Sequence, residues 1–143
     1  MIRGATDTEE TELDLTNDEQ EYLTTHQWAV LATGRKDGSP QVSMVGYALD
    51  GTDILATFRR TSAKRHNMAR QPRVALLIPD GRRALTVYGK AELLEEDPAR
   101  VEAFASILAG FGFPTPPEEL ADQMDAERRV AVRIRPTQVE LHE

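Results

Sequence analysis

The sequence predicts a mainly β fold of the α+β class, a small antiparallel barrel of six to seven strands with short helices inserted. Two observations support this prediction. Apolar and polar residues alternate over several strand-length runs, which is the period of a half-buried strand. Asp-Gly pairs at 37–38, 50–51 and 80–81 separate such runs, and this dipeptide is typical of tight hairpin turns.

The length of 143 residues suits one domain with a real core, which we place at residues 15–143. Residues 1–14 are polar and acidic, so we expect a flexible leader there. Residues 1–21 carry eight acids against Arg3, which gives 1 − 8 = −7, the net charge of the whole chain. The remaining 122 residues are therefore neutral overall, and the net acidity comes from residues 1–21, the leader and the segment that follows it.

In the first half of the domain, the sequence predicts a helix followed by a three-stranded meander. Thr16 and Glu19 have the spacing of a capping box, so a short helix begins there. Strands are expected at 28–35, 41–49 and 53–58, joined by the first two Asp-Gly turns. Gly46, inside the second strand, is a candidate bulge or point of close approach.

In the second half of the domain, the sequence predicts three further helices and three or four strands. Thr61 and Ser62 are N-cap residues of a helix that ends before Pro72, and two strands follow around the third Asp-Gly turn. Asp97 and Pro98 start a helix that runs to Gly110. A short helix after the prolines at 114–117, and one or two strands over 128–142, complete the chain.

Composition excludes several classes of function. The chain has no cysteine, so it has no disulfide, thiolate metal site or cysteine nucleophile. No signal peptide and no bilayer-length apolar run is present, and we expect a cytoplasmic protein without a membrane partner. The three histidines are scattered, so no metal is expected, and phosphate-loop and nucleophile-elbow motifs are absent. If the protein is an enzyme, a bound cofactor supplies the chemistry.

The segment 58–73 concentrates positive charge in an acidic chain. Residues 59–73 hold six Lys or Arg and no acid, where a strand pattern gives way to a helical one. A helix N-terminus offers unpaired N–H groups to an anion, and hydroxyl caps add further donors. We interpret the segment as a phosphate clamp, and a solvated helix surface is the alternative. Nucleic-acid binding is disfavoured, because no aromatic residues interleave with the charges and the rest of the domain is neutral.

The order of short motifs resembles the split β-barrel flavin- and deazaflavin-binding proteins, the superfamily of pyridoxamine 5′-phosphate oxidase. The motifs are Ala32-Thr33, Gly38-Ser39-Pro40, Ser62-Ala63-Lys64, Asn67-Met68 and Pro72-Arg73-Val74. The resemblance implies an FMN-binding split barrel over roughly residues 18–141. The most similar branch uses the deazaflavin coenzyme F-420, which implies a homodimer with two cofactor sites at the subunit interface.

The same resemblance implies a cofactor-binding set in four groups, although it identifies no catalytic residue. The groups are Ser43, Met44 and Val45 along the ring edge; Thr57 and Phe58 at the ring or ribityl chain; Arg59, Arg60, Thr61, Ser62 and Lys64 at the phosphate; and Arg129, toward the partner subunit's site. Among the residues at the phosphate, Ser62 and Lys64 match the residues that bind the phosphate in the family, and the other three are their neighbours in the sequence.

Two departures from the oxidase narrow the function. Ala63 stands where the oxidase has Arg, and the oxidase's C-terminal Trp- and Arg-containing substrate signature is missing. We therefore do not expect oxidation of pyridoxamine phosphate. The leading hypothesis is an oxidoreductase that transfers a hydride between F-420 and a small conjugated organic substrate. Two alternatives stay open: an FMN-binding flavin reductase or oxidase, and a non-catalytic carrier of a cofactor or haem.

Several other residues have two interpretations each. Tyr47 and His66 are conceivable proton donors, whereas a packed tyrosine and a surface histidine are the commoner roles. Trp28, Val30 and Leu31 are expected in the barrel core or at a dimer contact. The aromatic loop at 111–117 either packs against the domain or covers a pocket.

Overall fold

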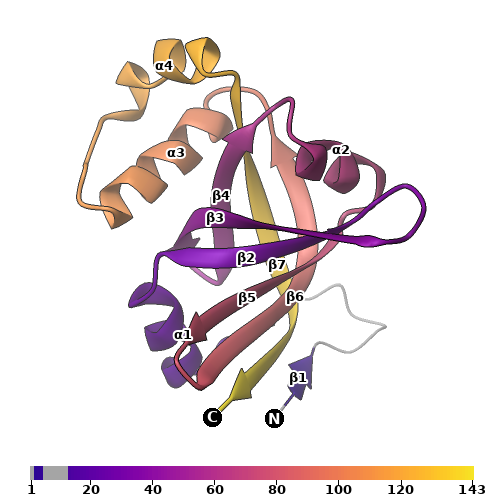
Figure 1. The fold of residues 1–143 in the computed structure, drawn as a ribbon. Helices are drawn as coiled ribbons and strands as arrows, with labels where there is room; N and C mark the ends of the chain where they lie inside the picture. Colours follow the sequence, from indigo (N-terminus) through magenta and orange to yellow (C-terminus); the bar gives the residue numbers. More distant parts are fainter. Residues whose placement is uncertain (1, 5–12) are drawn as a thin grey trace.

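The computed structural model of the chain describes residues 2–4 and 13–143 and shows a closed antiparallel β-barrel flanked by short helices (Figure 1). The barrel strands are β2 (Trp28–Gly34), β3 (Pro40–Asp50), β4 (Asp53–Arg59), β5 (Arg73–Asp80), β6 (Arg83–Leu94) and β7 (Arg129–His142). Their order is β7-β4-β3-β2-β5-β6, and β6 pairs back onto β7 to close the barrel. The predicted antiparallel barrel is confirmed.

The expected leader at residues 1–14 lies mostly outside the described residues, which omit 1 and 5–12. Strand β1 (Ile2–Gly4) pairs antiparallel with residues 138–140 of β7. Leu13 is buried in the barrel core. The division of the chain at residue 14 stays a prediction.

Helices close the barrel and cover one side of it (Figure 1). They are α1 (Asn17–Thr24), α2 (Ala63–Arg70), α3 (Ala99–Gly110), the 3₁₀ turn η1 (Pro117–Glu119) and α4 (Ala121–Ala126). Helices α1 and α2 lie at opposite ends of the barrel and insert Leu23 and Met68 into its core. Helix α3 packs Ala103 and Ile107 on the outer side of β4 and β7, and α4 packs on α3.

The predicted helix signals are largely confirmed, with one shift. Glu19 N–H donates to Thr16 Oγ1 at 3.2 Å, and Thr16 N–H donates to the Glu19 carboxylate at 2.9 Å, so the capping box is formed. Helix α3, however, begins at Ala99, with Pro98 in the N-cap position. Asp97 therefore lies one position before the N-cap, and its carboxylate accepts from the Arg100 guanidinium.

The C-terminal strand prediction resolves to a single 14-residue strand, β7. This strand pairs with β4 over residues 129–134 and with β6 over residues 131–142, so it is long enough to pass from one neighbour to the other. The register with β6 shifts between Tyr88 and Gly89. A side chain at Gly89 would place its Cβ 2.6 Å from the Arg135 carbonyl oxygen, so only glycine fits at this bulge.

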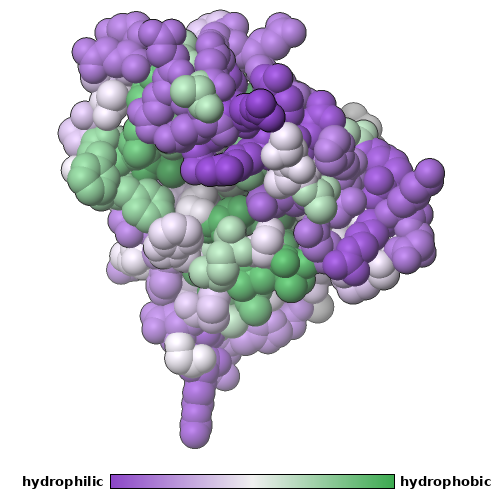
Figure 2. Space-filling view, turned by 45° about the horizontal axis from the view of Figure 1, so that its top comes forward, coloured by the Kyte–Doolittle hydropathy of each residue, from purple (hydrophilic) through white to green (hydrophobic). Residues whose placement is uncertain are grey.

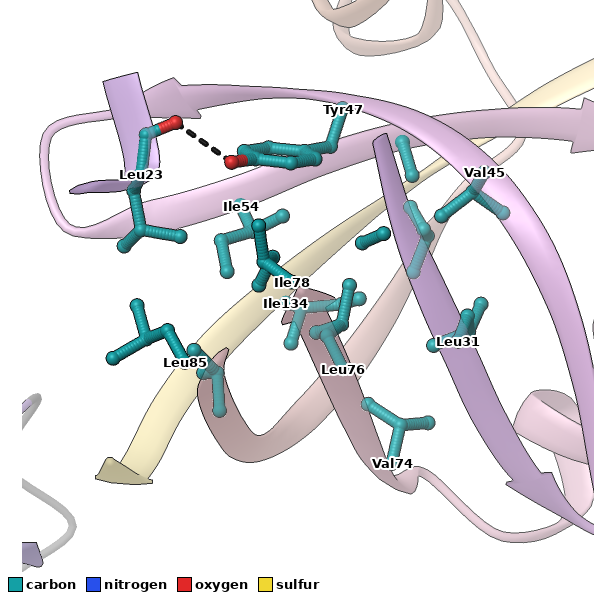
Figure 3. Packing of buried hydrophobic residues seen from close by; sticks show 14 of the residues in the cluster. Leu23, Leu31, Val45, Tyr47, Ile54, Val74, Leu76, Ile78, Leu85 and Ile134 are labelled. Atoms are coloured by element: carbon teal, nitrogen blue, oxygen red, sulfur yellow. Dashed lines mark hydrogen bonds between the residues drawn. The ribbon is translucent and has the colours of Figure 1, made fainter. Parts of the chain in front are cut away.

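The barrel interior is filled by the inward-facing residue of each alternating pair (Figure 3). Leu31, Val45 and Ile54 are almost fully buried, and each such side chain contributes roughly 1.5–3 kcal/mol to folding. The Tyr47 hydroxyl donates to the Leu23 carbonyl at 2.7 Å, which ties α1 to β3. Leu31 therefore belongs to the core, whereas Trp28, on the other face of β2, is exposed.

The barrel is split between β3 and β4. Strand β3 pairs with β4 only over Tyr47–Asp50, and with β2 over Pro40–Gly46. Strand β4 pairs only with β7 over its last three residues, Thr57–Arg59. In the described part of the chain, each strand therefore has an edge without a strand partner where the two diverge, and α2 follows β4 directly (Figure 1).

Candidate functional site

The predicted cofactor residues come from both sides of the split. Ser43, Met44 and Val45 lie on β3 where it pairs with β2 alone, and Thr57 and Phe58 end β4. The residues predicted to bind the phosphate lie at the turn from β4 into α2. Hydrogen-bonding edges and the N-terminus of a helix are thus brought to one region of the barrel.

We name Arg59, Arg60, Thr61, Ser62 and Lys64 the basic corner. Its turn is fixed by backbone bonds, because Ser62 N–H donates to Arg59 O at 3.0 Å and Arg60 N–H donates to Arg128 O at 2.7 Å. Ser62 takes the predicted N-cap position of α2 but makes no side-chain capping bond. Its Oγ is buried and has no hydrogen-bond partner among the described residues. A buried hydroxyl without a partner is destabilising, which makes Ser62 a candidate ligand-binding group.

Lys64 lies in the first turn of α2, with its amine 5.7 Å from the centre of the Phe58 ring. Within residues 13–143, no carboxylate forms an ion pair with this amine. Partial burial lowers the pKa of Lys64, because desolvation penalises the charged form. An anion at this position would therefore restore charge pairing that the protein alone does not provide.

Two other cations of the region are already paired. The Arg65 guanidinium donates to both oxygens of Glu95, at 2.8 and 3.1 Å, and so ties α2 to the end of β6. Arg129 donates from Nε to Glu127 at 2.8 Å. By contrast, Arg59 and Arg60 are exposed and form no ion pair with the residues that the structure describes.

The ring-side residues divide between the surface and the core. Met44 is 60% exposed and Ser43 is half-buried. The side chains of Val45 and Phe58 are buried in the barrel core, so only their backbone can face a ligand. Thr57 is partly buried and donates to the Val130 carbonyl at 2.9 Å, which holds β4 against β7.

Of the two conceivable proton donors, Tyr47 is a packed tyrosine and His66 is a surface histidine. The Tyr47 hydroxyl is buried and bonded to Leu23 O (Figure 3), and burial raises the pKa of Tyr47. It is therefore a poor acid and has no access to the split. His66 is exposed on α2.

Two residues that shape the site were not among the predicted site residues. Arg128 has a positive φ of 55°, and its carbonyl fixes the Arg60 peptide. Asn67 was assigned only to a motif, yet its amide donates to Thr33 at 3.1 Å and to Gln41 at 3.0 Å, which docks α2 on the β2–β3 hairpin. Both depend on contacts between distant parts of the chain, so local patterns do not reveal them.

The loop at 111–117 does two things that the sequence left open. Phe111 packs edge-on against Trp28, with ring centres 5.3 Å apart. Pro114, Pro116 and Pro117 line an open groove of about 590 Å³ along α3, and Arg133 borders a second hollow of about 260 Å³ between α3 and the barrel. Neither hollow includes the basic corner.

Residues 2–4 and 13–143 contain neither a metal-binding cluster of side chains nor a bilayer-spanning helix. No group of three or more His, Asp or Glu side chains among them is arranged to hold a metal ion. Likewise, none of the helices in the described ranges is long and apolar enough to span a bilayer.

A six-stranded antiparallel barrel, split beside the N-terminus of a basic helix, defines the split-barrel class to which flavin-type oxidoreductases belong. The chain itself belongs to the pyridoxamine 5′-phosphate oxidase family, whose sequence profile matches residues 15–143. No curated protein matches it significantly in sequence.

Solved structures agree with this assignment. A conserved hypothetical protein from Mycobacterium tuberculosis is 26% identical with a TM-score of 0.77, over 92% of this chain and 87% of that one. An F-420 reductase is 30% identical with a TM-score of 0.69, over 88% of this chain and 98% of that one. A haem storage protein from Vibrio cholerae shares the fold at 19% identity with a TM-score of 0.65, over 91% and 96% of the two chains. The class thus contains both oxidoreductases and haem-binding proteins.

Proposed function

We propose that this protein is an oxidoreductase that binds the deazaflavin coenzyme F-420 in the split and uses it to reduce a small conjugated organic acceptor. One observation carries the proposal: the buried Ser62 hydroxyl and the Lys64 amine lie two positions apart at the N-terminus of α2, and among the described residues neither has a hydrogen-bond acceptor or an acid as its partner. The 30% identity to an F-420 reductase supports this cofactor.

The residues present fit the phosphate of such a cofactor. The Ser62 hydroxyl and the first N–H groups of α2 would donate to phosphate oxygens, and Lys64 would balance their charge. The free edge of β3 beside Met44 would offer backbone donors to the ring. In its reduced form the bound coenzyme supplies a hydride, and the acceptor takes up that hydride together with a proton from solvent.

Arg59 and Arg60 favour F-420 over FMN. F-420 carries a polyglutamate tail beyond its phosphate, and these two exposed arginines form no ion pair among the described residues. Cations of this kind would interact with carboxylates of the tail in addition to the phosphate, whereas FMN, which ends at its phosphate, would offer them the phosphate alone. FMN binding remains the alternative that the experiment below must separate.

We also propose a homodimer, which rests on an uncharged outer face of the barrel. We define the outer β face as two rows of register partners across β3, β2, β5 and β6. The rows are Val42, Ala32, Ala75 and Tyr88, and Met44, Val30, Leu77 and Thr86. Val42 is 64% exposed, and apolar residues gather across the middle of the view in Figure 2, below hydrophilic ones. A contiguous apolar face of this kind is typical of a subunit interface.

The phosphate assignment is tested by titrating F-420 and FMN separately into the protein and following quenching of cofactor fluorescence. We expect F-420 to bind more tightly. Lys64→Ala should weaken its affinity by about 1.5–3 kcal/mol, the range for a hydrogen bond to a charged group. Lys36→Ala, an exposed lysine of the β2–β3 hairpin, is the matched control and should change nothing. An unchanged dissociation constant for Lys64→Ala at low salt would refute the clamp.

Turnover requires a second measurement, which separates an enzyme from a carrier. Reduced F-420 should be oxidised when an unsaturated acceptor is added to the wild-type protein, as followed by absorbance. Binding of the coenzyme without oxidation by any of a panel of quinones, tetrapyrroles and enones would instead favour a carrier.

A further inference from the structure

We infer that Trp28, Met44 and Phe111, grouped around Gly46, form a binding surface for the acceptor, and that it selects planar, uncharged, conjugated molecules. We name these three side chains the aromatic ledge. The inference rests on the proposed function for the identity of the reaction. The geometry of the ledge is independent of the cofactor.

The ledge occupies one end of the outer β face. Trp28 pairs with Gly46, and Val30 pairs with Met44, so these four positions share one face of the β2–β3 pair. Trp28 is 54% exposed and Met44 is 60% exposed. Met44 also belongs to the part of β3 that borders the split, so the ledge begins beside the proposed ring site.

The loop after α3 is held rigidly against this end of the sheet. Gln27 donates from Nε2 to the Gly110 carbonyl at 2.6 Å, which joins the end of α3 to the start of β2. The Phe111 amide donates to the carbonyls of Ile107 and Leu108, both at 3.1 Å. The Phe111 ring is therefore positioned by the backbone before any ligand arrives.

Gly46 leaves the space that the Phe111 ring occupies. A Cβ at position 46 would lie 3.0 Å from Phe111 Cζ and 3.6 Å from Trp28 Cζ3. A Cβ at residue 46 would therefore require the Phe111 ring to move by a few tenths of an ångström, and a larger side chain would displace it further. The edge-on pair at 5.3 Å, with planes 77° apart, holds the Trp28 ring in one orientation.

The chemistry of the ledge defines its ligand class. Two aromatic rings and a thioether offer dispersion and stacking, and none of the three side chains carries a charge. An anionic ligand would lose hydration at the ledge without gaining a cation in return, because the basic corner belongs to the coenzyme's phosphate. A flat, uncharged π-system is the molecule that this surface favours.

Trp28 is the only tryptophan of the chain, so its fluorescence reports directly on the ledge without any coenzyme. We would titrate the full chain with menadione, an uncharged planar quinone, and with anthraquinone-2-sulfonate, an anionic one. The chain has no cysteine that a quinone could alkylate. We expect saturable quenching by menadione, with an affinity at least tenfold tighter than that for the sulfonate.

Variants separate binding at the ledge from collisional quenching. Gly46→Val should displace Phe111 and weaken menadione binding at least fivefold. Phe111→Ala creates no clash and should weaken it about threefold to tenfold, the range expected for loss of one aromatic contact. Tyr88→Ala, an exposed aromatic residue on β6, three strands away from Met44, is the control and should leave the affinity unchanged. Thermal melting would show whether each variant is folded.

Linear quenching, or equal menadione affinity in Phe111→Ala and wild type, would overturn the inference. If F-420 binds through Lys64 but menadione does not saturate, the substrate class alone is wrong. If menadione saturates and F-420 does not bind, the ledge stands and the proposed function fails.

Discussion

The Ser62 side chain lies in an environment that would be more favourable with a ligand bound than in the protein alone. Its hydroxyl is buried without a partner, which is unfavourable, and it does not cap α2. A side chain held in this way suggests that its partner is a bound molecule.

Replacing Ser62 by Ala should therefore separate stability from binding. Urea denaturation should show a free energy of unfolding within about 0.5 kcal/mol of wild type, or higher, because an unpaired buried group is removed. F-420 affinity should fall by about 1.5 kcal/mol, through loss of a bond to an anion. Ser106→Ala on α3 is the matched control for both measurements. A loss of stability without a loss of affinity would show that Ser62 serves the fold.

At the residue scale, the sequence identified the basic corner because its members are adjacent and follow a motif order. It did not identify which cations are free. Arg65 belongs to the same run of positive charge, yet it is paired with Glu95, thirty positions along the chain. Pairing of this kind depends on how β6 returns beside α2, and no local pattern contains that information.

Among the elements, β6 depends on a glycine at its bulge. Gly89→Ala would place a methyl group 2.6 Å from the Arg135 carbonyl oxygen and 2.9 Å from Ile134 Cγ2. Because the obstacle is backbone, the β6–β7 pairing must shift, and we expect a loss of about 1–3 kcal/mol in the free energy of unfolding. Gly34→Ala meets no atom within 4 Å and should stay within about 0.5 kcal/mol of wild type. Equal denaturation midpoints for the two variants would contradict this explanation.

Helix α3 is tied to its surroundings by a buried arginine. Arg100 is 5% exposed at its side chain and pairs with Asp97 and with Asp125 of α4, each at 2.9 Å. Its Nη1 also donates to the Arg129 carbonyl at 3.3 Å. The contact therefore joins α3, α4 and the first residue of β7.

This contact predicts a specific pH dependence. The hydrogen bond from Arg100 lowers the pKa of Asp97 below its ordinary 3.8. The carboxylate therefore stabilises the fold above that value, and the contribution is lost as the pH falls through the lowered folded-state pKa. Asp97→Asn should lose about 0.5–1 kcal/mol between about pH 5 and 7, as is typical of partly exposed ion pairs. Its difference from wild type should shrink below pH 3.8, and a difference independent of pH would contradict the assignment.

The elements were predictable where short-range chemistry determines them. The three Asp-Gly turns place Gly38, Gly51 and Gly81 at positive φ, and the capping box starts α1. The start of α3 was not predictable, because Asp97 has two kinds of local partner, the first backbone amides of the helix and the Arg100 side chain three residues on. The split between β3 and β4 could not be predicted from local sequence patterns either. It depends on the pairing of the end of β4 with β7, which lies far along the chain.

At the scale of the whole molecule, the outer β face is the surface on which the proposed homodimer rests. Its two rows run across four strands without a charged side chain, while the opposite faces of the same strands form the core. The sequence shows this only as strands with apolar residues on both faces. The structure adds that the face continues into the aromatic ledge and borders the split, so a partner subunit placed there would enclose the cofactor region.

A charge at the centre of the outer β face should therefore separate the subunits. Leu77 lies between Val30 on β2 and Thr86 on β6 and is 38% exposed. Leu77→Glu should shift the mass measured by light scattering from twice that of the chain to that of a single chain, because a buried carboxylate at an apolar interface is strongly unfavourable. Gln20→Glu adds the same charge on the exposed side of α1 and should leave the dimer intact. If the cofactor region is completed by the second subunit, Leu77→Glu should also weaken F-420 binding although it lies outside the basic corner. A monomer that binds F-420 as tightly as wild type would show that one chain suffices for the site.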